Sequence, residues 1–501
     1  MRFPRAGGVL LHPTSLPGPH GSGDLGPAAY HFVDWLVTAR QRLWQILPLG
    51  NIGAGHSPYM SPSAFAGNVL LIALAELQAQ GWLAAGELDA PPDAAAGRID
   101  FAAMLPWRMQ RLRRAAAQFA ARADTAQRAD FEAFCTSHAG WLDDYALFMA
   151  LAEAHPDLLW CDWDAALAQR EPAALARARS AHADQIAFHR FCQWRFFDQW
   201  LRLRRHANER GVQIVGDAPI YVAYHSAEVW ARPELFELDA ARRPQVVAGV
   251  PPDYFSATGQ RWGNPLYRWP AHADQGYAWW IERVRRTFEL VDIVRIDHFR
   301  GFAHYWEIPA NEPTAVHGRW RAGPGAALFK AIAKALGPLP IIAEDLGLLT
   351  PDVGALRKRF AFPGMRILHF AFAEGSRNPY LPHHHEPDSV VYTGTHDNDT
   401  TLGWWAEASE HERAHARAYL GTDASEIHWD LIRAALASVA DTAIVPLQDV
   451  LGLDGKHRMN RPGEAQGHWG WRFDWSQVRP EHASRLATLT RLYDRGADSA
   501  G

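Results

Sequence analysis

Eight short apolar segments recur along this chain of 501 residues, and polar or charged residues follow them. Their apolarity is continuous rather than alternating, which is typical of parallel strands covered on both faces. Helical patterns lie between them, including 324–337, which Gly337 is expected to end, and 351–360. This alternation predicts an α/β protein built on a (β/α)8 TIM-type barrel, whose chemistry belongs at the C-terminal ends of the strands. The segments are 8–15, 44–50, 212–222, 291–299, 340–347, 365–372, 390–397 and 443–450.

Two connections between these segments are too long for simple crossovers. Residues 60–211 separate the second and third strands, and their Ala- and Arg-rich composition predicts a helical insertion. Its last helix, predicted over 187–211, carries an aromatic stripe that we interpret as core packing. Residues 223–290 separate the third and fourth strands and contain a loop at 249–269. We therefore predict one catalytic barrel domain over 1–501 with inserted, largely helical subdomains.

Composition argues against several classes of protein. The formal net charge is only −5 and no block is rich in Lys or Arg, so we expect no nucleic-acid partner. The three cysteines, Cys135, Cys161 and Cys192, lack CxxC spacing, which argues against disulfides or zinc and favours a reducing compartment. No apolar run suits a signal peptide or a membrane span, so we expect a cytoplasmic protein without a membrane partner. Neither a Walker loop nor a GxGxxG motif after a strand supports a nucleotide cofactor.

The fourth predicted strand, VDIVRIDHF at 291–299, contains an unusual pair of charges. Arg295 and Asp297 are two residues apart, so both side chains point to the same face of the strand. In isolation the pair can be a structural ion pair. Other strand ends, however, also carry charged or titratable residues, and all of these ends converge on one cleft in a parallel barrel. The additional candidates are Asp217, Glu344, His396 and Asp397.

Several carboxylates in one cleft are costly because like charges at short range disfavour ionisation. The cleavage of glycosidic bonds would explain such a cluster, since it uses one carboxylate as nucleophile and one protonated carboxylic acid to protonate the leaving oxygen. Arg295 is then expected to lower the pKa of Asp297, and a neighbouring negative charge to raise that of Glu344. A divalent-metal site is the alternative, because AED and HDND also offer oxygen ligands. No HxH or HxxxH pair accompanies them, and we assign no metal, including at the histidines 383–385.

Ten segments between residues 8 and 473 carry a resemblance to a known family. They read GVLLHPTSLPGPHGSGDLG, WQILPLG, SPYMSPSAFAGN, GDAPIYVAYHSAEVWA, GVPPDYFSATGQRWGNPLY, RIDHFRGF, IIAEDLG, FPGMRILHFAF, YTGTHDNDTTLGWW and RMNRPGEAQGHWGWRF. In these segments the chain resembles the 4-alpha-glucanotransferases of the amylomaltase or disproportionating-enzyme type, family 77 of the glycoside hydrolases in the alpha-amylase clan. The resemblance implies a (β/α)8 barrel with inserted subdomains, no cofactor, and maltooligosaccharides and alpha-1,4-glucans as donor and acceptor.

The resemblance also implies a role for each matching residue. Asp297 matches the nucleophile, Glu344 the acid/base and Asp397 the carboxylate that stabilises the transition state. Two aromatic residues, Tyr254 and Phe255, match the tip of a loop that arches over the cleft. The predicted substrate-binding residues are Tyr59, Asp217, Tyr254, Phe255, Arg295, Phe370 and His396.

Structural roles remain open for some of these residues. Asp217 can cap a turn before a proline, and Tyr59 can plug the mouth of the barrel. The aromatic pair at 254–255 can be buried in its own loop. We interpret Trp230 and Trp262 as packing residues.

The predicted function is that of a retaining 4-alpha-glucanotransferase. Such an enzyme moves alpha-1,4-glucan segments between maltooligosaccharides through a covalent glycosyl-enzyme and releases glucose. An amylase-like hydrolase and a catalytically silent glucan-binding protein are the alternatives. Two departures from the family pattern affect candidate sugar contacts, because His468 stands in GHW where the family usually has GNW, and Phe101 replaces a commoner tyrosine. The sequence does not indicate an oligomeric state.

Overall fold

Eight parallel strands form a barrel at the centre of the protein. The structure is a computed structural model that describes residues 3–89, 91, 97–252, 256–347, 350–464 and 466–496. The strand order is β10-β11-β12-β1-β2-β3-β6-β9. The Ala343 amide, at the end of β9, donates to the Pro363 carbonyl beside β10 at 2.9 Å, which brings the two edges of the sheet together. The strands are β1 (Ala6–Leu10), β2 (Leu43–Gln45), β3 (Gln213–Ala218), β6 (Ile293–Ile296), β9 (Ile341–Ala343), β10 (Gly364–Ile367), β11 (Ser389–Tyr392) and β12 (Thr442–Pro446).

Each predicted apolar segment supplies one of these strands, so the predicted barrel is confirmed. Every residue of β1, β2, β6, β9, β11 and β12 is buried, because helices cover the outside of the barrel and side chains fill its interior. This two-sided burial explains why the segments are apolar throughout rather than at every second position.

Helices connect most of the strands around the outside. The predicted stop at Gly337 is confirmed, since α11 ends one residue earlier and this glycine has φ 79°. The connection from β10 to β11 has no α-helix and contains the 3-10 turns Leu368–Phe370 and Pro382–His384. The helices that follow or precede barrel strands are α1 (Pro27–Thr38), α7 (Ala183–Glu209), α10 (Ala278–Leu290), α11 (Ala326–Leu336), α12 (Pro351–Arg359), α13 (Thr401–Glu407), α14 (Glu410–Leu420), α15 (Ile427–Ala437), α16 (Leu447–Leu451) and α17 (Pro480–Leu492).

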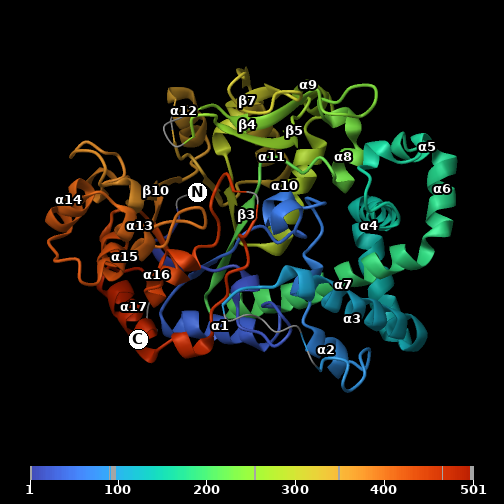
Figure 1. The fold of residues 1–501 in the computed structure, drawn as a ribbon, viewed down its shortest axis with the longest axis horizontal. Helices are drawn as coiled ribbons and strands as arrows, with labels where there is room; N and C mark the ends of the chain where they lie inside the picture. The colour runs from blue at the N-terminus through green and yellow to red at the C-terminus, as the bar shows by residue number, and fades with distance from the viewer. Residues whose placement is uncertain are drawn as a thin grey trace.

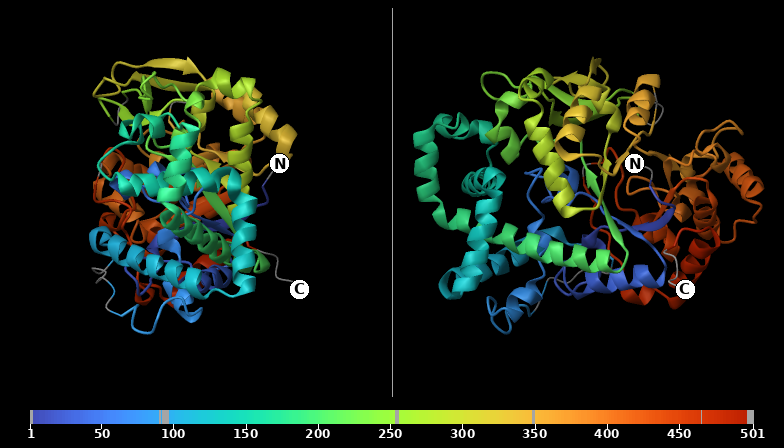
Figure 2. Two further views of the ribbon diagram at one scale, coloured as in Figure 1. Left: turned by 90° about the vertical axis from the view of Figure 1, so that its right-hand side faces the viewer. Right: turned by 180° about the vertical axis from the view of Figure 1, so that it is seen from behind.

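The connection between β2 and β3 carries a group of helices on one side of the barrel. In Figure 1 and in the right panel of Figure 2 these helices lie on the side of the barrel opposite the C-terminal helices α13–α17. The aromatic stripe of α7 is buried, which confirms its packing role, and the Trp200 indole donates to the Leu290 carbonyl at 2.7 Å. The domain boundaries at 60–211 and 223–290 stay predictions. The group consists of α2 (Leu74–Ala79), α3 (Phe101–Arg122), α4 (Thr125–Ala154), α5 (Ala165–Ala168), α6 (Pro172–Ala181) and α7.

A second, antiparallel sheet of four strands lies over the barrel and was not predicted from the sequence. Its order is β5-β4-β7-β8, and it joins the connection that follows β3 to the one that follows β6. The residues predicted as a loop at 249–269 include the end of β4, all of β5 and the start of α9, so that prediction was wrong in part. The strands of this sheet are β4 (Val246–Val250), β5 (Gln260–Pro265), β7 (His304–Pro309) and β8 (Arg319–Ala322). The connection from β3 to β6 also contains the short helices α8 (Ala227–Ala231) and α9 (Trp269–Asp274).

The composition of these strands explains why they were missed. β8 is exposed throughout and only the last two residues of β5 are buried, so neither has the continuous apolarity of a barrel strand. Gly249 and Gly263 interrupt the pattern, and a register shift separates Val247 from Gly249. Among the described residues, none of the helices has the length and apolarity that a membrane crossing requires.

Candidate active site

One cleft at the C-terminal ends of the barrel strands collects most of the predicted site residues. It contains about 1330 Å³ of empty space, including its open mouth. Asp217 lies buried immediately below, where it contacts two of the residues that line the cleft. Tyr254 and Phe255 lie outside the described residues. The predicted residues that line the cleft are Tyr59, Arg295, Asp297, Glu344, Phe370, His396 and Asp397.

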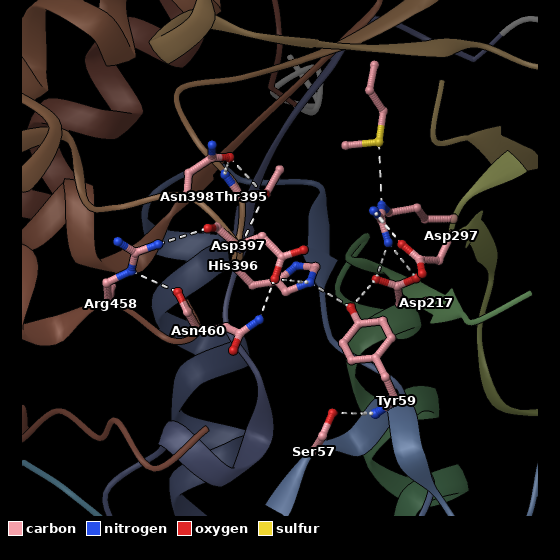
Figure 3. A network of polar contacts seen from close by, with 12 residues as sticks. Ser57, Tyr59, Asp217, Asp297, Thr395, His396, Asp397, Asn398, Arg458 and Asn460 are labelled. Carbon is pink, nitrogen blue, oxygen red and sulfur yellow. Dashed lines mark hydrogen bonds and ion pairs between the residues drawn. The ribbon is translucent and has the colours of Figure 1, made fainter. Parts of the chain in front are cut away.

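Arg295 and Asp297 form a three-residue cluster with Asp217, in which the arginine and Asp217 are buried. Asp217 on β3 stands opposite Arg295 on β6 in the parallel register. Arg295 Nη1 donates to both carboxylate oxygens of Asp217, at 2.8 and 2.6 Å, and its Nη2 lies 3.0 Å from Asp297 Oδ1. Figure 3 shows the two aspartates side by side above Tyr59. The arginine therefore holds Asp297 at the floor of the cleft, and Asp217 holds the arginine.

Glu344 follows β9 and is held by the backbone. Its Oε2 accepts from the His298 amide and its Oε1 from the Leu346 amide, both at 2.8 Å. His298 has φ 50°, a left-handed conformation that is uncommon without glycine, at the turn directly after the Asp297 strand end. The turn that presents the aspartate thus also supplies a donor to the glutamate.

Burial raises the pKa of both carboxyls. It brings Glu344 to about 7, opposed by the charge of Arg295 and increased further by Asp297. It brings Asp297 to about 6, again opposed by Arg295. Arg295 lowers the pKa of Asp297 as expected, but the pKa does not fall below its ordinary value, because removal from water outweighs the ion pair. The side chain of Asp297 is 29 % exposed to the open cleft, and Arg295 opposes the effect of burial by favouring the carboxylate form.

Tyr59 connects the Arg295 cluster to the opposite wall of the cleft. Its hydroxyl lies 2.8 Å from Asp217 Oδ2 and 2.8 Å from His396 Nε2, and the Tyr59 and His396 rings stack with centroids 5.3 Å apart. Burial raises the pKa of Tyr59 well above its ordinary value, so the phenol keeps its proton. Because the carboxylate accepts that proton, His396 Nε2 is the nitrogen that carries hydrogen and donates to the phenol oxygen.

Asp397 is more exposed than Asp297, with 43 % of its side chain accessible against 29 %. Its Oδ1 lies 3.4 Å from His396 Nε2 and accepts from Asn460 Nδ2 at 2.7 Å. Sequence reasoning missed Asn460 as a site residue. It stands in the quoted segment RMNRPGEAQGHWGWRF, but nothing in that segment indicates which side chain faces the aspartate.

Trp262, which we interpreted as a packing residue, does pack against the core, but it also has a position in the site that we did not predict. It lines the cleft, and its ring meets the His298 ring edge-on at 4.8 Å between centroids. The packing role of Trp230 is confirmed, because it is fully buried. Of the two family departures, His468 precedes the cleft-lining Trp469 and lies 3.3 Å from Glu464, and the Phe101 ring stacks on His56. Within the described ranges, no group of three or more His, Cys, Asp or Glu side chains is arranged to hold a metal ion.

Comparison with known proteins identifies the family to which this cleft belongs. The family model of the 4-alpha-glucanotransferases matches residues 11–477. The chain belongs to this family. A 4-alpha-glucanotransferase of Thermus thermophilus is 50 % identical over 503 residues, covering 99 % of this chain and 100 % of the relative. The enzyme of the same name from Synechocystis sp. is 49 % identical and covers 98 % of both chains.

Solved structures agree with this assignment. The amylomaltase of Streptococcus agalactiae, solved in complex with acarbose, superposes with a TM-score of 0.95 at 38 % identity, covering 98 % of this chain and 100 % of that one. The resemblance found in the sequence is confirmed. The protein is a 4-alpha-glucanotransferase, and it transfers segments of alpha-1,4-glucan.

Proposed function

We propose that this 4-alpha-glucanotransferase works by a retaining double displacement in which Asp297 is the nucleophile and Glu344 the acid/base. Asp297 attacks C1 of the donor sugar, and the glycosidic bond breaks as Glu344 gives its proton to the leaving oxygen. The 4-hydroxyl of an acceptor then attacks C1, the bond to Asp297 breaks, and Glu344 takes the hydroxyl proton. Two inversions at C1 restore the α configuration.

One observation carries this assignment: Asp297 and Glu344, at the ends of neighbouring strands, face the same cleft but have different surroundings. Asp297 has a cation 3.0 Å away, whereas Glu344 is held by two backbone amides and has its pKa raised to about 7 by burial. An ionised nucleophile and a protonated acid coexist best under such a difference. We expect the two carboxyl groups to lie about 5–5.5 Å apart, the spacing of retaining enzymes.

The remaining residues bind and polarise the donor in this proposal. Asp397 stabilises the positive charge that develops at C1, and Tyr59, His396 and Phe370 contact the donor from the walls of the cleft. Asp217 acts through Arg295 and Tyr59. The acarbose in the Streptococcus agalactiae relative supports an oligosaccharide ligand in this cleft. We further propose that maltooligosaccharides are donors and acceptors and that glucose is released when the leaving group is a single sugar.

We assign the preference of the glycosyl-enzyme for a sugar acceptor over water to the segment between β4 and β5. Tyr254 and Phe255 belong to this segment, and an acceptor sugar stacked on their rings gains proximity to C1 and excludes water. Trp262, on the adjacent strand, lines the same cleft. The cytoplasmic location predicted from the sequence stays a prediction.

Maltotriose as the only substrate tests this function. Transfer yields glucose together with products longer than maltotriose, and hydrolysis yields only shorter ones. A glucan-binding protein without activity leaves maltotriose unchanged. We expect longer products and glucose from the wild type and neither from Asp297→Asn. Products that are shortened only, at every substrate concentration, would contradict the proposal.

A further inference from the structure

The three catalytic carboxyls are held in three different ways, and the holding of Asp397 is unusual. Arg295 pairs with Asp297, and backbone amides hold Glu344. The Asp397 side chain is 43 % exposed, more than the 29 % of Asp297, and its shortest polar contact is with the side-chain amide of Asn460, 63 residues later in the chain, at 2.7 Å. Figure 3 shows this asparagine approaching from the side opposite Tyr59.

The backbone of Asn460 already fulfils a structural task. Its N–H donates to the His396 carbonyl at 3.1 Å, and its carbonyl accepts from Arg458 Nε at 2.8 Å. Arg458 Nη2 also donates to the Asp397 carbonyl at 3.0 Å, and its Nη1 lies 3.3 Å from Asp399 Oδ2. The two segments are therefore joined by one main-chain hydrogen bond and by the Arg458 side chain, and neither depends on the asparagine side chain.

The side chain of Asn460 is therefore not needed to join the two segments. It is only 9 % exposed, so it has little freedom to turn toward solvent. An amide donor to a carboxylate is charge-assisted and directional, so it selects one orientation of the Asp397 carboxyl. The other polar neighbour of this carboxyl, His396 Nε2, is farther away at 3.4 Å and is shared with Tyr59 at 2.8 Å.

We propose that Asn460 is a positioning residue, whose side-chain amide fixes the Asp397 carboxylate in the orientation that stabilises the transition state. This inference rests on the proposed role of Asp397. Asn460 itself lines the cleft, and the inference assigns its side chain to the Asp397 carboxylate rather than to the sugar. The segment after α16 thereby becomes part of the catalytic apparatus through one hydrogen bond.

Asn460→Leu tests the inference, because leucine has a similar shape and donates no hydrogen bond. We expect kcat on maltotriose to fall about 10- to 100-fold, the usual effect of a lost hydrogen bond to a charged group. KM should change less than about threefold, because the interaction acts in the transition state. Asn460→Asp, which places a second carboxylate against the first, should lower kcat further.

A matched control lies at the other end of the barrel. Asn208 Nδ2 donates to Asp292 Oδ2 at 2.8 Å, directly before β6 and remote from the cleft. Asn208→Ala removes an asparagine–aspartate hydrogen bond of the same kind, and we expect kcat and KM to stay at the wild-type values. An equal loss of kcat in both variants would overturn the inference, since it would reveal a general effect of destabilisation.

A double-mutant cycle with Asp397→Asn separates this inference from the proposed function. When Asp397 no longer carries charge, adding Asn460→Leu should change kcat by less than about twofold, because coupled residues are not additive. Fully additive losses, or a raised KM with unchanged kcat in Asn460→Leu, would overturn the positioning role alone. Asp397→Asn with kcat within about tenfold of wild type would instead overturn the assignment of Asp397 itself.

Discussion

The two walls of the cleft hold their carboxylates by different means. On the β3–β6 wall, Asp217 and Arg295 face each other in strand register and are nearly closed to solvent, and Asp297 follows two residues after the arginine. On the β11 wall, Asp397 stands in a turn after the strand, largely exposed, and a loop from beyond β12 supplies its hydrogen bond.

Because of this difference, we expect the two walls to respond differently to substitution. The β3–β6 wall is built by adjacent strands, so its geometry follows from the barrel itself and resists local change. The β11 wall depends on a distant segment that must fold against it correctly. Substitutions on the first wall should therefore affect both stability and chemistry, whereas those on the second should affect chemistry with little cost in stability.

The largest effect is expected at the floor of the first wall. Asp297→Asn keeps the shape of the side chain but removes the nucleophile, so transfer on maltotriose should fall about 1000-fold or more. Maltooligosaccharide binding, measured by calorimetry, should persist. Activity within about tenfold of the wild type would contradict the role of Asp297.

Glu344→Gln should produce the next largest effect. With maltotriose, whose leaving group needs a proton, we expect kcat to fall about 100- to 10 000-fold. With a donor such as an α-maltosyl fluoride, whose leaving group needs no proton, the first step should remain fast. Equal losses with both donors would show that Glu344 does not act as the acid, and the comparison requires only initial rates of fluoride release.

Arg295→Met tests the structural character of the first wall. It leaves the buried carboxylate of Asp217 without a cation, and breaking such a pair costs about 3–5 kcal/mol of unfolding free energy. The matched control is Arg204→Met, which breaks a more exposed pair with Asp292 of 2.6 Å at the opposite end of the same strand. Denaturant unfolding should show the larger loss for Arg295→Met, together with loss of transfer. Equal destabilisation would contradict a special role for the cluster.

The pH dependence of kcat/KM reports both carboxyls. Asp297 must be ionised and Glu344 protonated, and burial raises their pKa values to about 6 and about 7. Activity should therefore rise as pH increases through about 6 and fall as pH increases beyond about 7. In Glu344→Gln with the fluoride donor, the decline at higher pH should disappear while the rise at lower pH remains.

The smallest effect is expected at Tyr254 and Phe255. Tyr254→Ser or Phe255→Ser should raise the ratio of hydrolysis to transfer on maltotriose by about two- to tenfold, because water then competes better for the intermediate. The melting temperature should change little. A lower total activity at an unchanged ratio would show that the two rings do not select the acceptor.

The barrel and the first wall could be predicted from the sequence because their signals are local. Continuous apolar segments mark the eight strands, and the positions of Asp217, Arg295 and Asp297 within them place all three at the same end of the barrel. Tyr59, which the family resemblance added, and Phe370 both stand in 3-10 turns without a periodic signal of their own.

Other features could not be predicted, because they depend on contacts between distant segments. The antiparallel sheet pairs β4 with β7, and its strands are too exposed or interrupted to resemble strands. The net pKa of Asp297 depends on how completely the fold removes it from water, which no neighbouring residue in the sequence reveals. The contact between Asn460 and Asp397 also depends on distant segments, since the two residues are 63 positions apart in the sequence.

The most direct test of the central claim is mass spectrometry of Glu344→Gln after incubation with α-maltosyl fluoride. The first displacement should proceed and the second should stall, because no base remains to activate the acceptor. Peptide mapping should then find one maltosyl group on the peptide that contains Asp297, and the adduct should be absent from Glu344→Gln combined with Asp297→Asn. Rapid release of fluoride without an adduct, or an adduct on another residue, would contradict a retaining mechanism through Asp297.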